Sequence, residues 1–124
     1  MSEIINPQDA ELEEIIHGSC LIESKAITLI ADILRPEAFY NEKNLEIYAT
    51  LQSMYRNGQK IDIITVKEEL ARRGKLEFIG GPYTLAHISG RVASSAHLEY
   101  HARILKQKYI RRETILGFHK LLAL

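Results

Sequence analysis

The sequence predicts an all-α fold, in which a compact head of about five short helices is followed by a long C-terminal helix. Apolar residues recur at spacings of three and four along almost the whole chain. The three prolines lie at positions 7, 36 and 82, so none interrupts the chain beyond residue 82. A chain of 124 residues can bury one modest core but not two independent cores.

Composition restricts the class of protein. Apolar residues make up 46% of the chain and charged residues 26%, which is ordinary for a globular domain. No window approaches the ~18 uninterrupted apolar residues of a membrane span, and the N-terminus lacks the basic start of a signal peptide. A single cysteine, Cys20, excludes an internal disulfide and a multi-cysteine zinc site. We therefore expect a cytoplasmic protein with no membrane contact.

Charge is balanced overall but unevenly distributed. Sixteen basic and sixteen acidic residues cancel, so no global field is available to hold duplex DNA strongly. Six acids and no base precede Lys25, whereas six bases accompany one acid from His101 onward. Three explanations stay open: attraction between the two ends, separate partner surfaces, and solvated helix faces.

The first half of the head is predicted to hold three helices. One begins at Asp9, with acids in its first turn. A second covers residues 22–34 and is stopped by Pro36. A third covers residues 41–56 and ends at Asn57-Gly58. Apolar residues expected to face the core are Leu12, Ile15, Ile16, Cys20, Ala26, Ile27, Ile30, Ile33 or Leu34, Leu45, Tyr48, Leu51 and Tyr55.

Two shorter helices are predicted in the second half of the head. Thr65 and Glu68 fit a capping box, which predicts a helix that opens at Thr65, buries Leu70 and ends at Gly74. A turn at residues 80–82 then precedes a helix over residues 83–89.

The last helix is predicted to be capped by Ser95 and to run to Leu124, about 43 Å at ~1.5 Å per residue. A compact domain of this length is roughly 35 Å across, so the helix would project beyond the head. Leu98, Ala102 and Leu105 begin one core-facing stripe. The sequence thus divides into a flexible N-terminus (residues 1–8), a helical head (9–94) and a long helix (95–124).

Beyond residue 110 the apolar residues change side and broaden. An apolar helix end is not stable alone in water, so we expect a second chain or a returning helix to cover it. We also expect the chain to be a fragment of something longer, because it stops inside this helix without a cap. The residues predicted to form this self-association or partner surface are Tyr109, Arg111, Arg112, Ile115, Leu116, Phe118, Leu121 and Leu122.

Motifs for catalysis or metal binding are weak or absent, and we predict no catalytic, cofactor-binding or metal-ligating residue. The chain has no GxxxxGK[ST] phosphate loop. His97 and His101 share a helix face, but Glu99 does not occupy the base position of a zinc-binding H-E-x-x-H motif. Cys20 lies one helical turn from His17, and a free cysteine on an apolar face is usually a core residue.

Six stretches follow one another along the chain in a characteristic order: residues 18–22 (GSCLI), 35–40 (RPEAFY), 47–55, 61–70, 80–83 (GGPY) and 95–104 (SAHLEYHARI). Together they resemble the N-terminal domain of bacterial replicative DNA helicases of the DnaB type. His17 and His97 stand where that family usually has an apolar residue and an asparagine.

The resemblance implies a helical head and one arm of a dimerisation hairpin. It implies hexamer assembly, as a trimer of dimers in a collar, and recruitment of primase through the primase's C-terminal domain. ATP and magnesium would belong to the parent's ATPase domain, which this sequence does not contain. The chain itself is then expected to be non-catalytic, with no cofactor and no strong direct DNA binding.

Two alternatives come from the residues alone. A helix-turn-helix-like DNA-binding domain would use Lys67, Arg72 and Arg73, although Glu68 and Glu69 would face the phosphates. A small hydrolase would use His17 and Cys20, and it would need a reactive thiol.

Overall fold

The computed structural model describes residues 8–123 and places them in an all-helical fold, as predicted. Five α-helices contain most of these residues, with two 3₁₀ turns between the first and second helices. The elements are α1 (Gln8–Ile22), η2 (Ala26–Leu29), η3 (Pro36–Ala38), α2 (Glu42–Arg56), α3 (Ile63–Arg72), α4 (Pro82–Gly90) and α5 (Leu98–Leu122). The predicted N-terminal part, residues 1–8, lies outside the described residues except for Gln8. No helix among the described residues is long and apolar enough to cross a bilayer.

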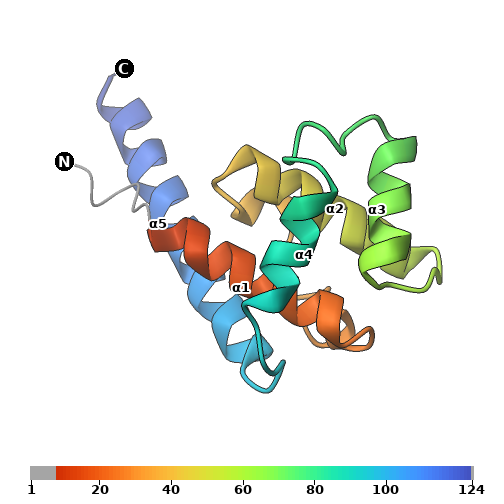
Figure 1. The fold of residues 1–124 in the computed structure, drawn as a ribbon. Coiled ribbons are helices and arrows are strands. Elements are labelled where there is room, and N and C mark those ends of the chain that lie inside the picture. The colour runs from red at the N-terminus through yellow and green to blue at the C-terminus, as the bar shows by residue number, and fades with distance from the viewer. Residues whose placement is uncertain (1–7, 124) are drawn as a thin grey trace.

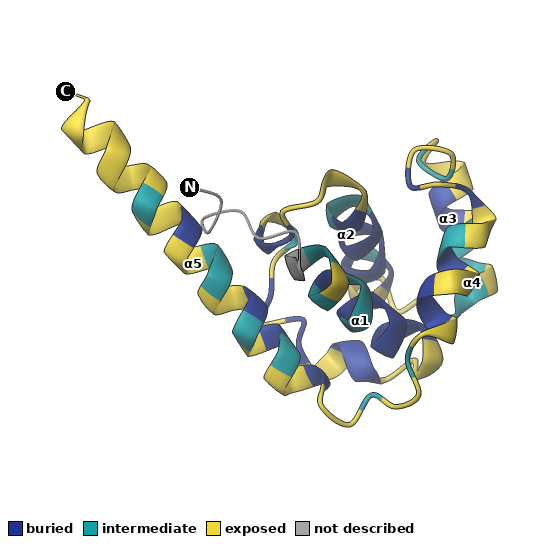
Figure 2. Cartoon of the chain, turned by 60° about the vertical axis from the view of Figure 1, so that its left-hand side comes forward, coloured by how far each residue is buried: buried dark blue, intermediate teal, exposed yellow. Residues whose placement is uncertain are grey.

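The head consists of α1 to α4 with their connections, and α5 runs along one side of it (Figure 1). Helix α1 is central, because it contacts α2, α4 and α5. The C-terminal part of α5 extends past the head into solvent (Figures 1 and 2). We call residues 113–122 the α5 tip.

The core confirms most of the predicted apolar positions. Leu51, Tyr48 and Leu70 are fully buried, whereas Leu45 is half-buried against the core. Tyr55 was expected in the core and is exposed. Helix α2 has neighbours on more than one side, so its buried positions also include Ile47 and Met54 and do not follow a single stripe.

The predicted helix over residues 22–34 is wrong. Its only regular element is the short 3₁₀ turn η2. In the segment that follows, some backbone N–H groups bond to the carbonyl three residues earlier and others to the carbonyl four residues earlier. The N–H groups of Ile30 and Ala31 both donate to the carbonyl of Ile27, at 3.1 and 2.9 Å. Several β-branched residues lower the helix propensity here, and η2 packs against α1, α2 and α5 at once. The side predicted to be apolar is nevertheless mostly buried.

The predicted start of α3 is three residues too late. Asp62 is the N-cap: its carboxylate accepts from the N–H of Thr65 at 2.8 Å, and the Thr65 hydroxyl accepts from the N–H of Asp62 at 2.9 Å. Thr65 therefore occupies position N3 of a capping box, and not the N-cap position that was predicted for it. Helix α5 likewise begins at Leu98, and Ser95 does not cap it with its side chain.

Close contact between α1 and α4 depends on Gly18. A Cβ atom at this position would lie 2.5 Å from Cγ2 of Val92 and 2.8 Å from the carbonyl oxygen of Ile88. Only a residue without a side chain lets the two helices approach this closely. The contact places Val92, at the start of the α4–α5 connection, directly against α1.

Candidate protein–protein interface

Helix α5 is attached to the head by one stripe of its surface. Leu98, Ala102 and Leu105 are buried in the core, and Tyr109 is half-buried at its edge. These residues recur at spacings of four and three, so they lie on one side of the helix. Figure 2 shows buried positions alternating with exposed ones along this half of α5.

Arg112 continues the attached stripe and does not belong to the exposed surface that was predicted for it. Its side chain is only 7% exposed and donates to the carbonyl oxygen of Ala38 at 3.2 Å. Its guanidinium carbon lies 5.3 Å from the ring centre of Tyr40 and 5.7 Å from that of Tyr109. Arg112 thus fastens α5 to the head through polar and cation–π contacts.

A buried carboxylate lies beneath this junction. Glu13 of α1 accepts from the backbone N–H groups of Tyr40 and Asn41, at 2.7 and 3.3 Å, and from the side-chain amide of Asn44 at 3.0 Å. Burial raises the pKa of Glu13, and these hydrogen bonds together with the charge of Arg112 oppose the increase. Glu13 therefore joins the start of α2 to α1, close to the point where α5 leaves the head.

The α5 tip carries most of the predicted interface residues. Ile115 is half-buried, whereas Leu116, Phe118, Leu121 and Leu122 are exposed. Phe118 is 59% exposed and Leu122 67% exposed, so the head covers neither side chain. Arg111 is exposed just before the tip. The structure thus brings six of the eight predicted residues onto one accessible segment and turns Tyr109 and Arg112 toward the head.

The second face of α5 could have been found from spacing alone. Tyr100, Ile104, Arg111, Ile115, Phe118 and Leu122 recur at intervals of four, seven, four, three and four residues. They form a stripe on the side of the helix that faces away from the head. We call this stripe the outer face of α5. It begins beside the head and not at the tip, where the sequence predicted it.

The proposed Cys20–His17 pair does not have the features of a nucleophilic site. Cys20 is buried, and burial raises the pKa of its thiol to about 12. Nε2 of His17 donates to the carbonyl oxygen of Asn44 at 2.9 Å. The His17 ring stacks on Phe39, with centroids 4.8 Å apart. His17 is therefore a neutral core residue, which agrees with the apolar residue that related sequences were expected to have here.

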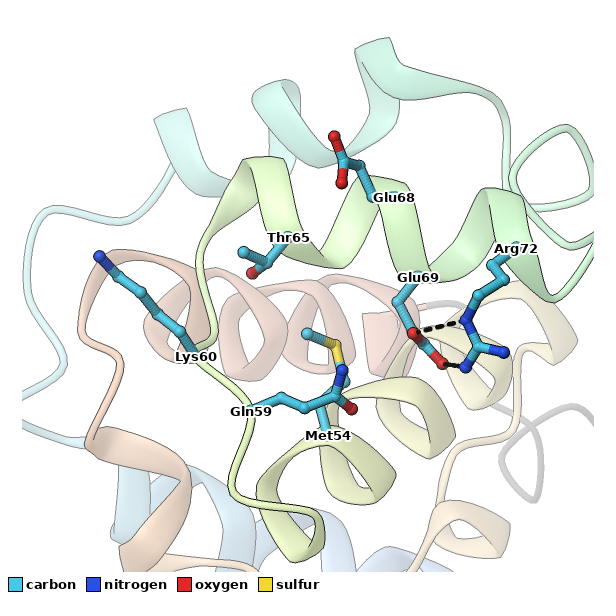
Figure 3. A pocket seen from close by; sticks show the side chains of 7 residues that line it. All are labelled: Met54, Gln59, Lys60, Thr65, Glu68, Glu69 and Arg72. Carbon is cyan, nitrogen blue, oxygen red and sulfur yellow. Dashed lines mark hydrogen bonds and ion pairs between the residues drawn. The ribbon is translucent and has the colours of Figure 1, made fainter.

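The two arginines at the end of α3 form ion pairs with Glu69, and Figure 3 shows the pair with Arg72. Glu69 is buried beside the groove between α2 and α3 and receives hydrogen bonds from both Arg72 and Arg73. These bonds lower the pKa of Glu69. The groove has a volume of about 450 Å³, and Lys60 and Glu68 add charges of opposite sign to its lining. A helix presenting both arginines to DNA would have to break these ion pairs, which weakens the helix-turn-helix interpretation.

His97 and His101 lie close together at the start of α5. Their ring centroids are 6.3 Å apart, and burial together with His97 lowers the pKa of His101. Across residues 8–123, no group of three or more His, Cys, Asp or Glu side chains has the geometry to hold a metal ion. Two histidines supply fewer ligands than a structural zinc site uses.

Comparison with known sequences identifies relatives across most of the chain. The family described as "DnaB-like helicase N terminal domain" matches residues 5–107. The chain is 42% identical over 108 residues to the replicative DNA helicase DnaB of Rhodothermus marinus, covering 87% of this chain and 12% of that protein. It is 33% identical over 119 residues to the replicative DNA helicase DnaC of Bacillus subtilis, covering 93% of this chain and 26% of that protein. The chain thus spans about a quarter or less of these helicases.

Two solved structures share the fold. The N-terminal domain of DnaB helicase from Mycobacterium tuberculosis matches with a TM-score of 0.88 and 31% identity, covering 94% of this chain and 85% of that chain. A DnaB-like replicative helicase, described together with its interactions with primase, matches with a TM-score of 0.78 and 29% identity, covering 92% of this chain and 27% of that chain.

Proposed function

Because this chain belongs to the DnaB-like helicase N-terminal domain family, we propose that it is the non-catalytic assembly and docking domain of a replicative helicase. The observation that carries this proposal is the exposed apolar surface of the α5 tip. Contiguous apolar surface on a small domain marks an interaction site. The tip lies beyond residue 107, where the family match ends, so the argument for pairing is independent of the match.

Pairing between two copies of the chain is the simplest way to cover the tip. A self-complementary patch is usually buried by a two-fold axis, which brings the same surface from both partners together. Phe118 and Leu122 would lie in the centre of this contact. Arg111 and Lys120 are exposed beside it and would set encounter rate and register more than affinity. Three such dimers would form the collar of a hexamer.

Docking of primase is the second part of the proposal. A solved relative with the same fold is described with its interactions with primase. We propose that this chain also binds primase, through the primase's C-terminal domain, and that its role belongs to DNA replication in the cytoplasm. ATP and magnesium would be bound by a separate ATPase domain of the parent helicase and not by this chain.

The mass of the chain in solution tests the pairing. Sedimentation velocity of the wild-type chain should show a monomer–dimer equilibrium that depends on concentration. The double variant Phe118→Asp with Leu122→Asp should be monomeric, with circular dichroism showing an intact head. A matched control, Ile64→Asp with Tyr83→Asp, adds the same two charges at exposed apolar positions on α3 and α4 and should dimerise like the wild type.

The pairing proposal is wrong if the wild-type chain stays monomeric at the highest attainable concentration, or if both double variants lose association equally. Titration calorimetry with a purified primase C-terminal domain tests docking separately. Heat of binding that persists in the Phe118→Asp, Leu122→Asp variant would support a docking surface on the head. If the wild-type chain forms dimers but does not bind the primase C-terminal domain, only the docking part of the proposal is rejected.

A further inference from the structure

Two buried charges of opposite sign flank the segment that connects η3 to α2. Glu13 of α1 is 0% exposed, and Arg112 of α5 is 7% exposed. Tyr40 contacts both: its backbone N–H donates to the Glu13 carboxylate at 2.7 Å, and its ring centre lies 5.3 Å from the guanidinium carbon of Arg112. Two residues earlier, the carbonyl oxygen of Ala38 accepts from Arg112. One short segment of the chain therefore joins the two charges.

The guanidinium group of Arg112 is incompletely satisfied. Its Nη2 donates to the carbonyl oxygen of Ala38 at 3.2 Å, whereas its Nη1 is buried and has no hydrogen-bond partner among residues 8–123. The groups that contact it, this carbonyl and the rings of Tyr40 and Tyr109, carry no net charge. A buried cation without a compensating negative charge is costly. The position of Arg112 should therefore depend on the charge of Glu13, which interacts with it electrostatically.

The charge of Glu13 can change while its neighbours keep theirs. Burial disfavours the carboxylate, whereas the Asn44 amide, two backbone N–H groups and the charge of Arg112 favour it. The charged group of α5 that acts on Glu13 is thus Arg112, and α2 supplies a neutral amide. On α1 itself, Glu14 is paired with an arginine of the α4–α5 connection. His17, one turn further along α1, stays neutral because burial lowers its pKa to about 3.

We propose that Glu13 and Arg112 form a proton-sensitive latch, which holds the middle of α5 against the head when Glu13 is ionised and loosens when Glu13 takes up a proton. The neutral carboxyl group no longer attracts the guanidinium group. Its proton also turns one of two accepting oxygens into a donor, which then faces N–H groups that are donors themselves. Protonation should therefore weaken the hold on Tyr40 as well as the attraction to Arg112.

The latch controls the exposed half of α5. Arg112 is the last buried residue in the described part of this helix. When Arg112 leaves its site, α5 remains attached to the core through Leu98, Ala102 and Leu105, and the α5 tip is free to move relative to the head. That such movement regulates pairing or docking rests on the proposed function, whereas the latch itself depends only on contacts within one chain.

Thermodynamic linkage fixes the size of the effect. Protonation of Glu13 and detachment of Arg112 favour each other by the same factor. If detachment raises the pKa of Glu13 by one unit, protonation raises the opening constant of this part of α5 tenfold. The two quantities can be measured separately, and they must agree.

Hydrogen exchange of the full chain measures the opening of α5 near Arg112. From about pH 8 to pH 4, the protection of amides 108–113, corrected for intrinsic exchange rates, should fall as Glu13 titrates. Exchange that does not depend on urea separates this local opening from global unfolding. NMR titration of Glu13 in the wild type and in Arg112→Met gives the difference in pKa, and this difference predicts the factor by which protection falls.

Two variants remove the latch from opposite sides. Arg112→Met should have low protection of these amides at every pH, with no step where Glu13 titrates. Glu13→Gln, which keeps the shape of the neutral carboxyl group, should also have low protection at every pH. Circular dichroism checks that each variant is folded, and either variant alone is sufficient for the test.

Three controls should keep the step in protection. Arg111→Met removes an exposed cation next to Arg112. Glu14→Gln removes an acid of α1 that is paired elsewhere. The double variant Phe118→Asp with Leu122→Asp removes the apolar tip and should keep the step, because pairing through the tip is not part of the latch.

The proposal is overturned if protection of these amides does not change as Glu13 titrates, or if Arg111→Met or Glu14→Gln loses the step as Arg112→Met does. A fall in protection that does not match the difference in Glu13 pKa would also overturn it. A step that disappears in the tip variant would mean that pairing, and not the latch, protects α5. A step that persists there supports the latch even if the wild-type chain is monomeric, so failure of the pairing proposal and failure of the latch are distinguishable.

Discussion

The guanidinium group of Arg112 lies 5.3 Å from the ring centre of Tyr40, in the connection between η3 and α2. This contact joins the middle of α5 to a segment far earlier in the sequence. It is reinforced by the hydrogen bond from Arg112 to the carbonyl oxygen of Ala38, at 3.2 Å. Beyond Arg112, no residue of the described part of α5 is fully buried. Arg112 is therefore the last buried residue that attaches α5 to the head before the tip.

Replacing Arg112 should destabilise the chain and alter Glu13. Arg112→Met keeps the aliphatic packing but removes the hydrogen bond and the cation–π contacts, so we expect a loss of about 2–3 kcal/mol of unfolding free energy. The pKa of Glu13 should rise further, because the charge of Arg112 lowers it. Urea denaturation and NMR titration of Glu13 measure the two effects. The exposed Arg111→Met is the control and should change stability by less than about 0.5 kcal/mol. Equal losses in the two variants would contradict a fastening role for Arg112.

The helical class and the projecting last helix could be predicted because both depend on spacing that extends over many residues. The role of Arg112 could not, although it continues the interval of Leu98, Ala102, Leu105 and Tyr109. A search for apolar periodicity does not count an arginine, and only the tertiary structure places a carbonyl and two aromatic rings around its guanidinium group. Glu13 was missed for the same reason.

The prediction of helix boundaries failed where one short stretch of sequence offered two possible N-cap residues. Both Asp62 and Thr65 can cap a helix, and the sequence Thr65–Glu68 imitates a capping box. The structure uses Asp62 and leaves Glu68 exposed. Asp62→Ala should therefore cost about 1 kcal/mol of unfolding free energy, and Glu68→Ala should change it by less than about 0.5 kcal/mol. A larger loss for Glu68→Ala than for Asp62→Ala, in thermal or urea denaturation, would instead support the helix start predicted from the sequence, with Thr65 as the N-cap.

Two glycines within helices should respond in opposite ways to alanine. Gly18→Ala places a Cβ 2.5 Å from the side chain of Val92 and 2.8 Å from the backbone of Ile88, so we expect a loss of about 1–3 kcal/mol. A Cβ added at Gly117, on the α5 tip, would meet no neighbouring atom within 4 Å. Gly117→Ala should raise the helicity of the tip, by up to about 1 kcal/mol in propensity. Urea denaturation and far-ultraviolet circular dichroism compare the two alanine variants. A loss of stability in Gly117→Ala would show that the tip is already packed against a neighbour.

ATP turnover should be absent from this chain. No phosphate loop of the form GxxxxGK[ST] occurs in the sequence, and phosphoryl transfer requires a preformed cradle for the phosphates and the metal. Phosphate release by the purified chain should equal that of a buffer blank with magnesium and ATP present. Activity that co-purifies with the chain and survives in the Phe118→Asp, Leu122→Asp variant would contradict the non-catalytic part of the proposed function.

Acid should destabilise the fold through His17. Its ring is fully buried, and burial lowers its pKa from 6.5 to about 3. Unfolding exposes the ring, which then takes up a proton at any pH between these two values. The contribution of His17 to stability is therefore complete above pH 6.5 and is lost as the pH falls toward 3, at about 1.4 kcal/mol per pH unit.

Glu13 acts in the opposite direction. Its pKa is raised in the fold, so the native state holds a proton that the unfolded chain releases above pH 4.5. The contribution of Glu13 to stability is lost as the pH rises through the raised pKa.

The effect of His17 is tested by comparing the wild type with His17→Leu, using urea midpoints measured from about pH 7 to pH 4. The variant should have a pH dependence shallower than that of the wild type by about 1.4 kcal/mol per unit, while exposed His87→Gln should match the wild type. Parallel curves for His17→Leu and wild type would mean that the His17 ring is solvated or charged in the fold.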